Sequence, residues 1–135
     1  DQASETVTRL SLELGGNAPV LVFGDVNIET AAQLAVTWKT RNCGQVCVSP
    51  QRFYVHESVY ERFAERVTAH TAALRVGHGL QEGTQVGPLI NGAQQERVEA
   101  LVERTIEQGA KLETGGTRRS GPGYFYAPTV LSGVA

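Results

Sequence analysis

Short apolar runs alternate along the chain with longer stretches in which apolar residues recur every three or four positions. Residues 18–23, APVLVF, form a continuous apolar run that predicts a strand covered on both faces. Residues 52–56 alternate like a second strand, and residues 110–114 and 127–132 predict two more. Because stretches with helical spacing lie between strands, the pattern predicts βαβ units and an α/β fold with a largely parallel sheet flanked by helices.

Residues that can cap helices precede each of the three helical stretches. Asn27 is predicted to cap the first helix, and Asn91 the third, which Gly109 would end. Ser58, with Glu61 three residues later, matches a capping box for the second helix. The predicted buried positions of the three helices are, in order, Ala31, Leu34, Ala35 and Trp38; Val59, Phe63 and Val67; and Val98, Leu101, Val102, Thr105 and Ile106.

Two segments are rich in glycine. Residues 77–87 contain four glycines and form a loop that is long for a compact domain, so we expect it to have a function or a neighbour. Residues 115–123, GGTRRSGPG, also contain two arginines. We interpret this second segment as a solvated surface loop and not as an anion site.

Composition narrows the class of protein. The 135 residues are 41% hydrophobic and 19% charged, which suits a folded domain of ordinary size. A net charge of -2 offers no basic surface to nucleic acid, no apolar run approaches the roughly 18 residues of a membrane span, and residues 1–10 do not resemble a signal peptide. The chain contains no methionine and stops directly after a predicted strand, so we expect it to be a piece of a longer protein.

Both cysteines, Cys43 and Cys47, lie in the stretch NCGQVCVSP, residues 42–50. Two cysteines are too few for a disulfide framework, so a reducing compartment, the cytoplasm, is expected. The C-x3-C spacing and the absence of paired histidines argue against zinc, and no metal site is expected. A disulfide between the two would need a suitable local backbone. For Cys43, composition favours a simple packing role, because free cysteine is commonly buried.

Cys47 has a setting in which a thiol could react. It follows the expected end of a helix and lies between Gly44 and Pro50, so it could be exposed on a turn of fixed shape. Gly44 permits close approach of a backbone or substrate, and backbone amides near a turn could stabilise an oxyanion. Arg41 and Arg52 flank the stretch and either raise the local positive potential or, as we favour, pair with surface acids. From the residues alone, a nucleophile and a packing residue both remain open for Cys47.

Glu13 lies in LELGGNAP, residues 12–19, between two leucines. Apolar neighbours can desolvate a carboxylate and suit it to act as a general base. The alternative, an exposed carboxylate at a strand edge, is more common for an isolated glutamate. Gly15 and Gly16 follow, but the G-x-G-x-x-G and Walker patterns are absent, so they are a weak phosphate-binding signal.

Together these stretches resemble the signatures of the aldehyde dehydrogenase family. LELGGNAP is similar to the family's glutamate signature, and RNCGQVCVSPQR, residues 41–52, to its cysteine signature. Glu13 and Cys47 lie 34 positions apart, in the family's usual order. Residues 87–116 (GPLINGAQQERVEALVERTIEQGAKLETGG) and 121–134 (GPGYFYAPTVLSGV) also resemble the family, in order, so the resemblance covers essentially the whole chain.

The resemblance implies a role for each matching residue. Cys47 matches the nucleophile, Glu13 the general base and Asn42 a structural asparagine, whereas Cys43 falls at a variable position without a catalytic role. The implied reaction is the oxidation of a small aldehyde to a carboxylic acid with NAD or NADP. In it Cys47 adds to the carbonyl, hydride passes to the nicotinamide ring, and Glu13 activates the water that hydrolyses the thioester. Several motifs look closest to the branch that includes succinate-semialdehyde dehydrogenases.

The resemblance also implies a truncated catalytic domain. Residues 1–16 would be the end of the cofactor-binding domain, and residues 17–135 part of the catalytic, thiol-bearing domain. The cofactor-binding residues stay unknown, because the family binds the cofactor mainly through segments absent from this chain. The full-length enzyme is expected to form a homo-oligomer, and the fragment alone to be inactive and prone to self-association. A CoA-acylating relative, against which Glu13 argues, and a non-catalytic thiol-redox or binding module are the alternatives.

Overall fold

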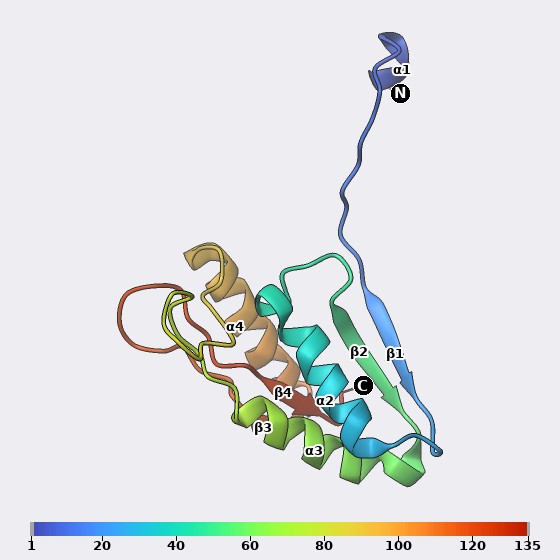
Figure 1. Cartoon of the computed structure of the whole chain (residues 1–135), viewed down its shortest axis with the longest axis vertical. Coiled ribbons are helices and arrows are strands. Elements are labelled where there is room, and N and C mark those ends of the chain that lie inside the picture. Colours follow the sequence, from blue (N-terminus) through green and yellow to red (C-terminus); the bar gives the residue numbers. More distant parts are fainter. Residues whose placement is uncertain (1, 135) are drawn as a thin grey trace.

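The computed structural model describes residues 2–134, and an N-terminal arm extends away from a body of helices and two small sheets (Figure 1). No helix among these residues is both long and apolar enough to cross a membrane. The elements follow one another in the order α1 (Gln2–Glu5), β1 (Ala18–Val22), α2 (Ile28–Thr40), the 3-10 turn η1 (Arg41–Gly44), β2 (Pro50–Val55), the 3-10 turn η2 (Glu57–Val59), α3 (Tyr60–Ala72), α4 (Gly92–Glu107), β3 (Lys111–Thr114) and β4 (Val130–Ser132).

The first sheet is a parallel pair, β1 and β2, connected through α2. Val20 lies opposite Phe53 and Val22 opposite Val55, which confirms the predicted βαβ unit. The expectation that β1 is covered on both faces is wrong for the described residues. Burial alternates along the strand, and Leu21 is 63% exposed, because the helices pack on the face that carries Val20 and Val22.

The second sheet, β3 and β4, is antiparallel and separate from the first. The α/β fold is confirmed, but the parallel arrangement is limited to β1 and β2. The connection is consistent with the difference, because residues 115–129 form no helix, and a helix is the usual crossover between parallel strands. Gly115 begins this loop with a φ of 82°, and a Cβ there would lie 2.2 Å from the carbonyl oxygen of Pro128.

The main core lies between the parallel sheet and helices α2 and α3. Ala32 is fully buried, Phe63 is almost so, and the rings of Phe53 and Phe63 pack with centroids 6.2 Å apart. The predicted face of α2 is only partly right, since Leu34 and Trp38 are half exposed. The apolar residues of α2 lie around much of its circumference, so their spacing alone is compatible with two overlapping buried faces. The residues that α2 buries are Ile28, Ala32, Ala35 and Val36.

Two predicted helix caps are confirmed. Oδ1 of Asn27 accepts a hydrogen bond from the amide of Thr30 at 3.0 Å, and Oδ1 of Asn91 accepts one from the amide of Gln94 at 2.9 Å. Gly109 follows α4 with a φ of 102°, the left-handed conformation predicted for its end. The two asparagines thus define where α2 begins after β1 and where α4 begins after the glycine-rich loop.

The predicted capping box at Ser58 is wrong. The turn η2 precedes α3, and Nδ1 of His56 accepts the hydrogen bond from the amide of Ser58 at 3.2 Å. The imidazole thus caps η2, while α3 begins after Val59 without a side-chain cap. Val59 and Phe63 are nevertheless buried as predicted, and both belong to the main core.

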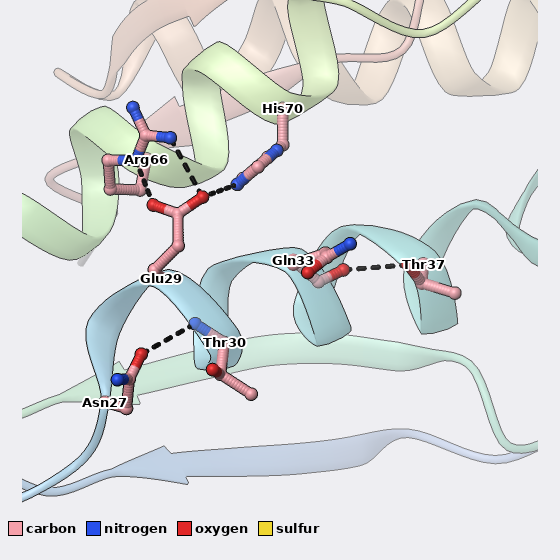
Figure 2. Close-up of polar contacts among 7 residues, drawn as sticks. All are labelled: Asn27, Glu29, Thr30, Gln33, Thr37, Arg66 and His70. Atoms are coloured by element: carbon pink, nitrogen blue, oxygen red, sulfur yellow. Dashed lines mark hydrogen bonds and ion pairs between the residues drawn. The ribbon is translucent and has the colours of Figure 1, made fainter.

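Helices α2 and α3 are joined by a carboxylate with two basic partners (Figure 2). Nε of Arg66 lies 2.5 Å from Oε2 of Glu29, Nη2 of Arg66 lies 2.9 Å from Oε1, and Nε2 of His70 lies 2.9 Å from Oε1. The hydrogen bonds from Arg66, opposed by some desolvation and supported by His70, hold the pKa of Glu29 below its ordinary value of 4.5.

A lowered carboxyl pKa predicts the sign of a pH effect. Such a group stabilises the folded state above its unfolded pKa, and the contribution is lost as pH falls through the folded pKa. We expect Glu29→Gln to lower the free energy of unfolding modestly at neutral pH, because the pair is exposed, and to have less effect well below pH 4.5. Urea denaturation at both pH values measures this. An equal loss at both would contradict the assignment, and Glu107→Gln, at a residue without an ion pair among residues 2–134, is the control.

Candidate active site

The backbone just after α2 adopts left-handed conformations at three consecutive residues. Asn42, Cys43 and Gly44 have φ values of 48°, 59° and 76°. Such values are uncommon for residues other than glycine and are maintained only where neighbouring contacts hold them. Here the Asn42 carbonyl accepts from the amide of Gln45 at 3.0 Å, and Nδ2 of Asn42 donates to the Gln45 carbonyl at 3.2 Å. Asn42 therefore stabilises this backbone conformation through two hydrogen bonds to Gln45.

Cys47 lies on a tight turn that follows this segment. The amide of Ser49 donates to the carbonyl of Val46 at 3.1 Å, which makes Cys47 the first central residue of the turn. Its side chain is free and exposed, which is one of the two possibilities that the sequence left open. Within residues 2–134, no hydrogen-bond acceptor is bound to the Cys47 amide. The turn thus presents a thiol and a free backbone donor side by side, the pair that a nucleophile with an oxyanion site requires.

A polar cluster of Lys39, Ser49 and Gln51 adjoins the turn, and of the three only the serine is buried. Ser49 is fully buried, and Nζ of Lys39 donates to its hydroxyl at 3.4 Å and to Oε1 of Gln51 at 3.1 Å. Burial lowers the pKa of the Lys39 ammonium. A Cβ at Gly44 would lie 3.1 Å from the Lys39 carbonyl oxygen, so glycine allows the segment to pack against α2. No motif pointed to Lys39 or Ser49, because a lysine at a helix end and a serine in a turn are ordinary surface residues.

The segment after the glycine-rich loop packs against the other side of the turn. Sγ of Cys43 donates to the carbonyl of Gly87 at 3.2 Å and lies 3.5 Å from the carbonyl of Pro88. Oε1 of Gln45 accepts from the amide of Ile90 at 3.1 Å. The expected neighbour of the long loop is therefore the cysteine segment itself.

Glu13 and Cys47 are connected through Gly16. A Cβ at Gly16 would lie 2.3 Å from the Cys47 carbonyl oxygen, so the two backbones touch in a way that only glycine permits. Glu13 is three residues upstream, which places its Cα within about 11 Å of that of Gly16. The structure thus brings the glutamate segment alongside the cysteine turn. In the sequence, Gly16 is only part of a weak phosphate-binding signal, and no short motif indicates its contact with Cys47.

Glu13 has the exposed position that the sequence favours for an isolated glutamate, and not the desolvated one that would suit a general base. Glu13 is exposed and forms no side-chain hydrogen bond or ion pair with residues 2–134. Leu12 and Leu14, which were expected to shield it, are themselves 66% and 70% exposed. The reason is the arm, which continues β1 away from the body, so that none of the other described residues covers it (Figure 1). The arm therefore meets the cysteine turn at Gly16, while the Glu13 carboxylate and the Cys47 thiol are each exposed.

The arginines beside the turn do not pair with acids, contrary to the interpretation favoured from the sequence. Neither Arg41 nor Arg52 forms an ion pair among the described residues, and the Arg52 guanidinium lies 6.0 Å from the centre of the Tyr54 ring. Arg41 instead lines an open depression of about 450 Å³ together with Trp38 and Gln85. This depression does not include Cys47 or Glu13. Within residues 2–134, no three His, Cys, Asp or Glu side chains are grouped so that they could hold a metal ion.

Comparison with known proteins places these features in a family. The family model described as "Aldehyde dehydrogenase family" matches residues 1–135. The chain is 44% identical over 133 residues to 3-sulfolactaldehyde dehydrogenase of Pseudomonas putida, covering 98% of this chain and 27% of that protein. It is 46% identical over 132 residues to succinate-semialdehyde dehydrogenase of Paenarthrobacter nicotinovorans, covering 98% and 29%.

A solved structure shows the same fold. Succinate-semialdehyde dehydrogenase from Burkholderia pseudomallei superposes with a TM-score of 0.92 at 44% identity, over 99% of this chain and 28% of that one. The chain therefore spans slightly more than a quarter of the length of the relatives it matches. With the family model matching every residue and the relatives more than 40% identical, the chain belongs to the aldehyde dehydrogenase family.

Proposed function

We propose that this chain carries the nucleophile and the general base of an NAD(P)+-dependent enzyme that oxidises a small aldehyde to a carboxylic acid. The observation that carries the proposal is the Gly16 contact, which holds the Glu13 segment against the turn of an exposed cysteine. Family membership supplies the reaction class, and the geometry supports the two residues as a pair.

Cys47 is the proposed nucleophile. Its thiolate forms a bond to the aldehyde carbon, and the carbonyl oxygen becomes an oxyanion. The free amide of Cys47, at the same turn, is placed to donate to that oxyanion. The hydrogen bond from half-buried Lys39 to buried Ser49 supports the turn and limits its movement during the reaction. After loss of hydride the substrate is an acyl group on sulfur, a thioester.

Glu13 is the proposed general base for hydrolysis of the thioester. Its carboxylate takes a proton from water as the water oxygen bonds to the acyl carbon, and the Cys47 thiolate leaves with the electron pair. The product is the carboxylic acid, and the thiol is regenerated. In the complete protein, a neighbouring domain that covers the arm would exclude bulk water from this carboxylate and raise its basicity in the manner the sequence suggested.

The nicotinamide cofactor, when bound, accepts the hydride. This chain does not hold it by itself, because residues 2–134 contain no glycine-rich turn between a strand and a helix N-terminus that would bind a pyrophosphate. We therefore assign cofactor binding to parts of the protein outside this chain. Residues 1–16 are proposed to belong to that cofactor domain and residues 17–135 to the thiol domain, since the arm leaves the body and exposes Leu10, Leu12 and Leu14.

The names of the relatives favour an aldehyde that also bears an acidic group. Sulfolactaldehyde, succinate semialdehyde and glutarate semialdehyde are all small anionic aldehydes. Arg41 is a cation on the cysteine segment without an acidic partner among residues 2–134, so it is available to attract such a group. A homo-oligomer and a reducing compartment, which keeps Cys47 as a free thiol, complete the proposal.

The test is an assay of the complete protein that contains this chain. We expect aldehyde-dependent reduction of NAD+ or NADP+ without CoA, and faster turnover of succinate semialdehyde than of butanal. Dependence on CoA, with an acyl-CoA as product, would replace hydrolysis by the acylating alternative. Absence of cofactor reduction with every small aldehyde, together with a reversible Cys43–Cys47 disulfide, would support a thiol-redox module instead.

A further inference from the structure

We propose that Cys43 is a positioning residue for Cys47, acting as a thiol hydrogen-bond donor that fastens the cysteine turn to residues 87–90. The inference rests on the proposed role of Cys47 as nucleophile. It assigns a function to a residue that the family resemblance left without one.

The Cys43 side chain is held between two segments that are far apart in sequence. Its Sγ donates to the Gly87 carbonyl at 3.2 Å, and the Pro88 carbonyl lies 3.5 Å away. The side chain is half-buried, and burial raises the pKa of its thiol. A raised pKa keeps Cys43 protonated at neutral pH, and only the protonated thiol can donate to a carbonyl. The same burial makes Cys43 a poor nucleophile, which separates its role from that of Cys47.

A second hydrogen bond joins the same two segments. Oε1 of Gln45 accepts from the amide of Ile90 at 3.1 Å, and Nε2 of Gln45 donates to the Asn42 carbonyl at 3.3 Å. Residues 43 and 45 therefore contact residues 87 to 90 on both sides of Gly44. A single hydrogen bond from a thiol is weak, but together with the hydrogen bond to Gln45 it joins the two segments at two points.

The backbone conformation explains why this fastening affects Cys47. Cys43 has a φ of 59° and a ψ of 27°, a left-handed conformation that a non-glycine residue keeps only when contacts hold it. Release of the side chain allows Asn42 and Cys43 to relax toward ordinary backbone angles. Because Cys47 is four residues further along a turn, such a relaxation moves its thiol relative to Gly16 and the Glu13 segment.

The experiment compares Cys43→Ala with Cys43→Ser in the complete protein. Alanine removes the hydrogen-bond donor but must adopt the same left-handed backbone conformation, whereas serine keeps a donor at nearly the same place. Iodoacetamide is the probe, and mass spectrometry of the Cys47 peptide gives its alkylation rate between pH 6 and pH 9. We expect Cys43→Ala to slow alkylation of Cys47 about tenfold and to shift its pH profile, with kcat falling and KM for the aldehyde little changed. Cys43→Ser should keep at least half of the wild-type alkylation rate and at least half of the wild-type kcat.

Thr105→Val, which removes the hydroxyl that donates to the Leu101 carbonyl on α4, is the matched control and should leave alkylation unchanged. A Cys43→Ala protein with the wild-type alkylation rate and pH profile would overturn the proposal. Equal losses in the alanine and serine variants would also overturn it, since packing and not donation would then matter. If Cys43→Ala does not fold, the serine variant decides alone. Alkylation of Cys47 at half the wild-type rate or more then supports the proposal, and a slower rate overturns it. Wild-type protein that keeps its activity after alkylation of Cys47 would instead refute the proposed function.

Discussion

Replacing Cys47 by serine should reduce aldehyde oxidation by the complete protein at least about a thousandfold, because a neutral hydroxyl is a far weaker nucleophile than a thiolate. The substitution changes one atom on an exposed turn, so the fold should not change. Steady-state rates of cofactor reduction at saturating aldehyde measure the loss, and the melting temperature should stay within a few degrees of wild type.

The control for this prediction is a hydroxyl-bearing residue away from the turn. Thr105→Val on α4 should keep wild-type turnover, which shows that the assay tolerates a conservative change. A Cys47→Ser protein that retains more than about a tenth of the activity would mean that another residue carries the substrate, because loss of an essential nucleophile leaves far less. Cys43 would then be the first alternative to test.

Gly16→Ala should reduce turnover about a hundredfold, because misplacement of catalytic groups by about 1 Å is enough for such a loss. A Cβ at Gly16 would lie 2.3 Å from the Cys47 carbonyl oxygen, a contact too close for any real side chain. The obstacle is backbone and cannot rotate away. Either the arm with Glu13 or the turn with Cys47 must therefore move.

Gly15→Ala is a closely matched control. It makes the same chemical change one residue earlier, where a Cβ would meet nothing within 4 Å. We expect Gly15→Ala to keep turnover within about threefold of wild type, since a conservative surface change of this kind alters stability by only a few tenths of a kcal/mol. If the two variants have the same rate, the Gly16 contact does not position the pair, and the structural basis for combining Glu13 with Cys47 is lost.

Local pattern predicted the elements of the fold better than their pairing. The run at residues 18–23 and the caps at Asn27 and Asn91 were recognised because each depends on residues close in sequence. The antiparallel pairing of β3 with β4 depends on where the loop of residues 115–129 returns the chain, and the face of α2 depends on which side the sheet occupies. These are consequences of tertiary packing, which overrides local periodicity.

The candidate site shows the same limit. The exposure of Cys47 on a turn followed from Gly44 and Pro50, which are its neighbours in sequence. The contacts of Gly16 with Cys47 and of Cys43 with Gly87 join residues more than 30 positions apart, and no short motif encodes them. The exposure of Glu13 in this chain agrees with the alternative that the sequence favours, but its solvation in the complete protein depends on what covers the arm.

The central claim is that Cys47 becomes acylated by the aldehyde and that Glu13 is needed to release the acid. It is tested most directly with Glu13→Gln in the complete protein, mixed with aldehyde and oxidised cofactor, stopped with acid and mapped by mass spectrometry. The account predicts that the Cys47 peptide gains the mass of the acyl group, that the Cys43 site stays unmodified, and that the adduct is much scarcer in wild type. An adduct at any other residue, or an unmodified Cys47 in a variant that still reduces the cofactor, would contradict it.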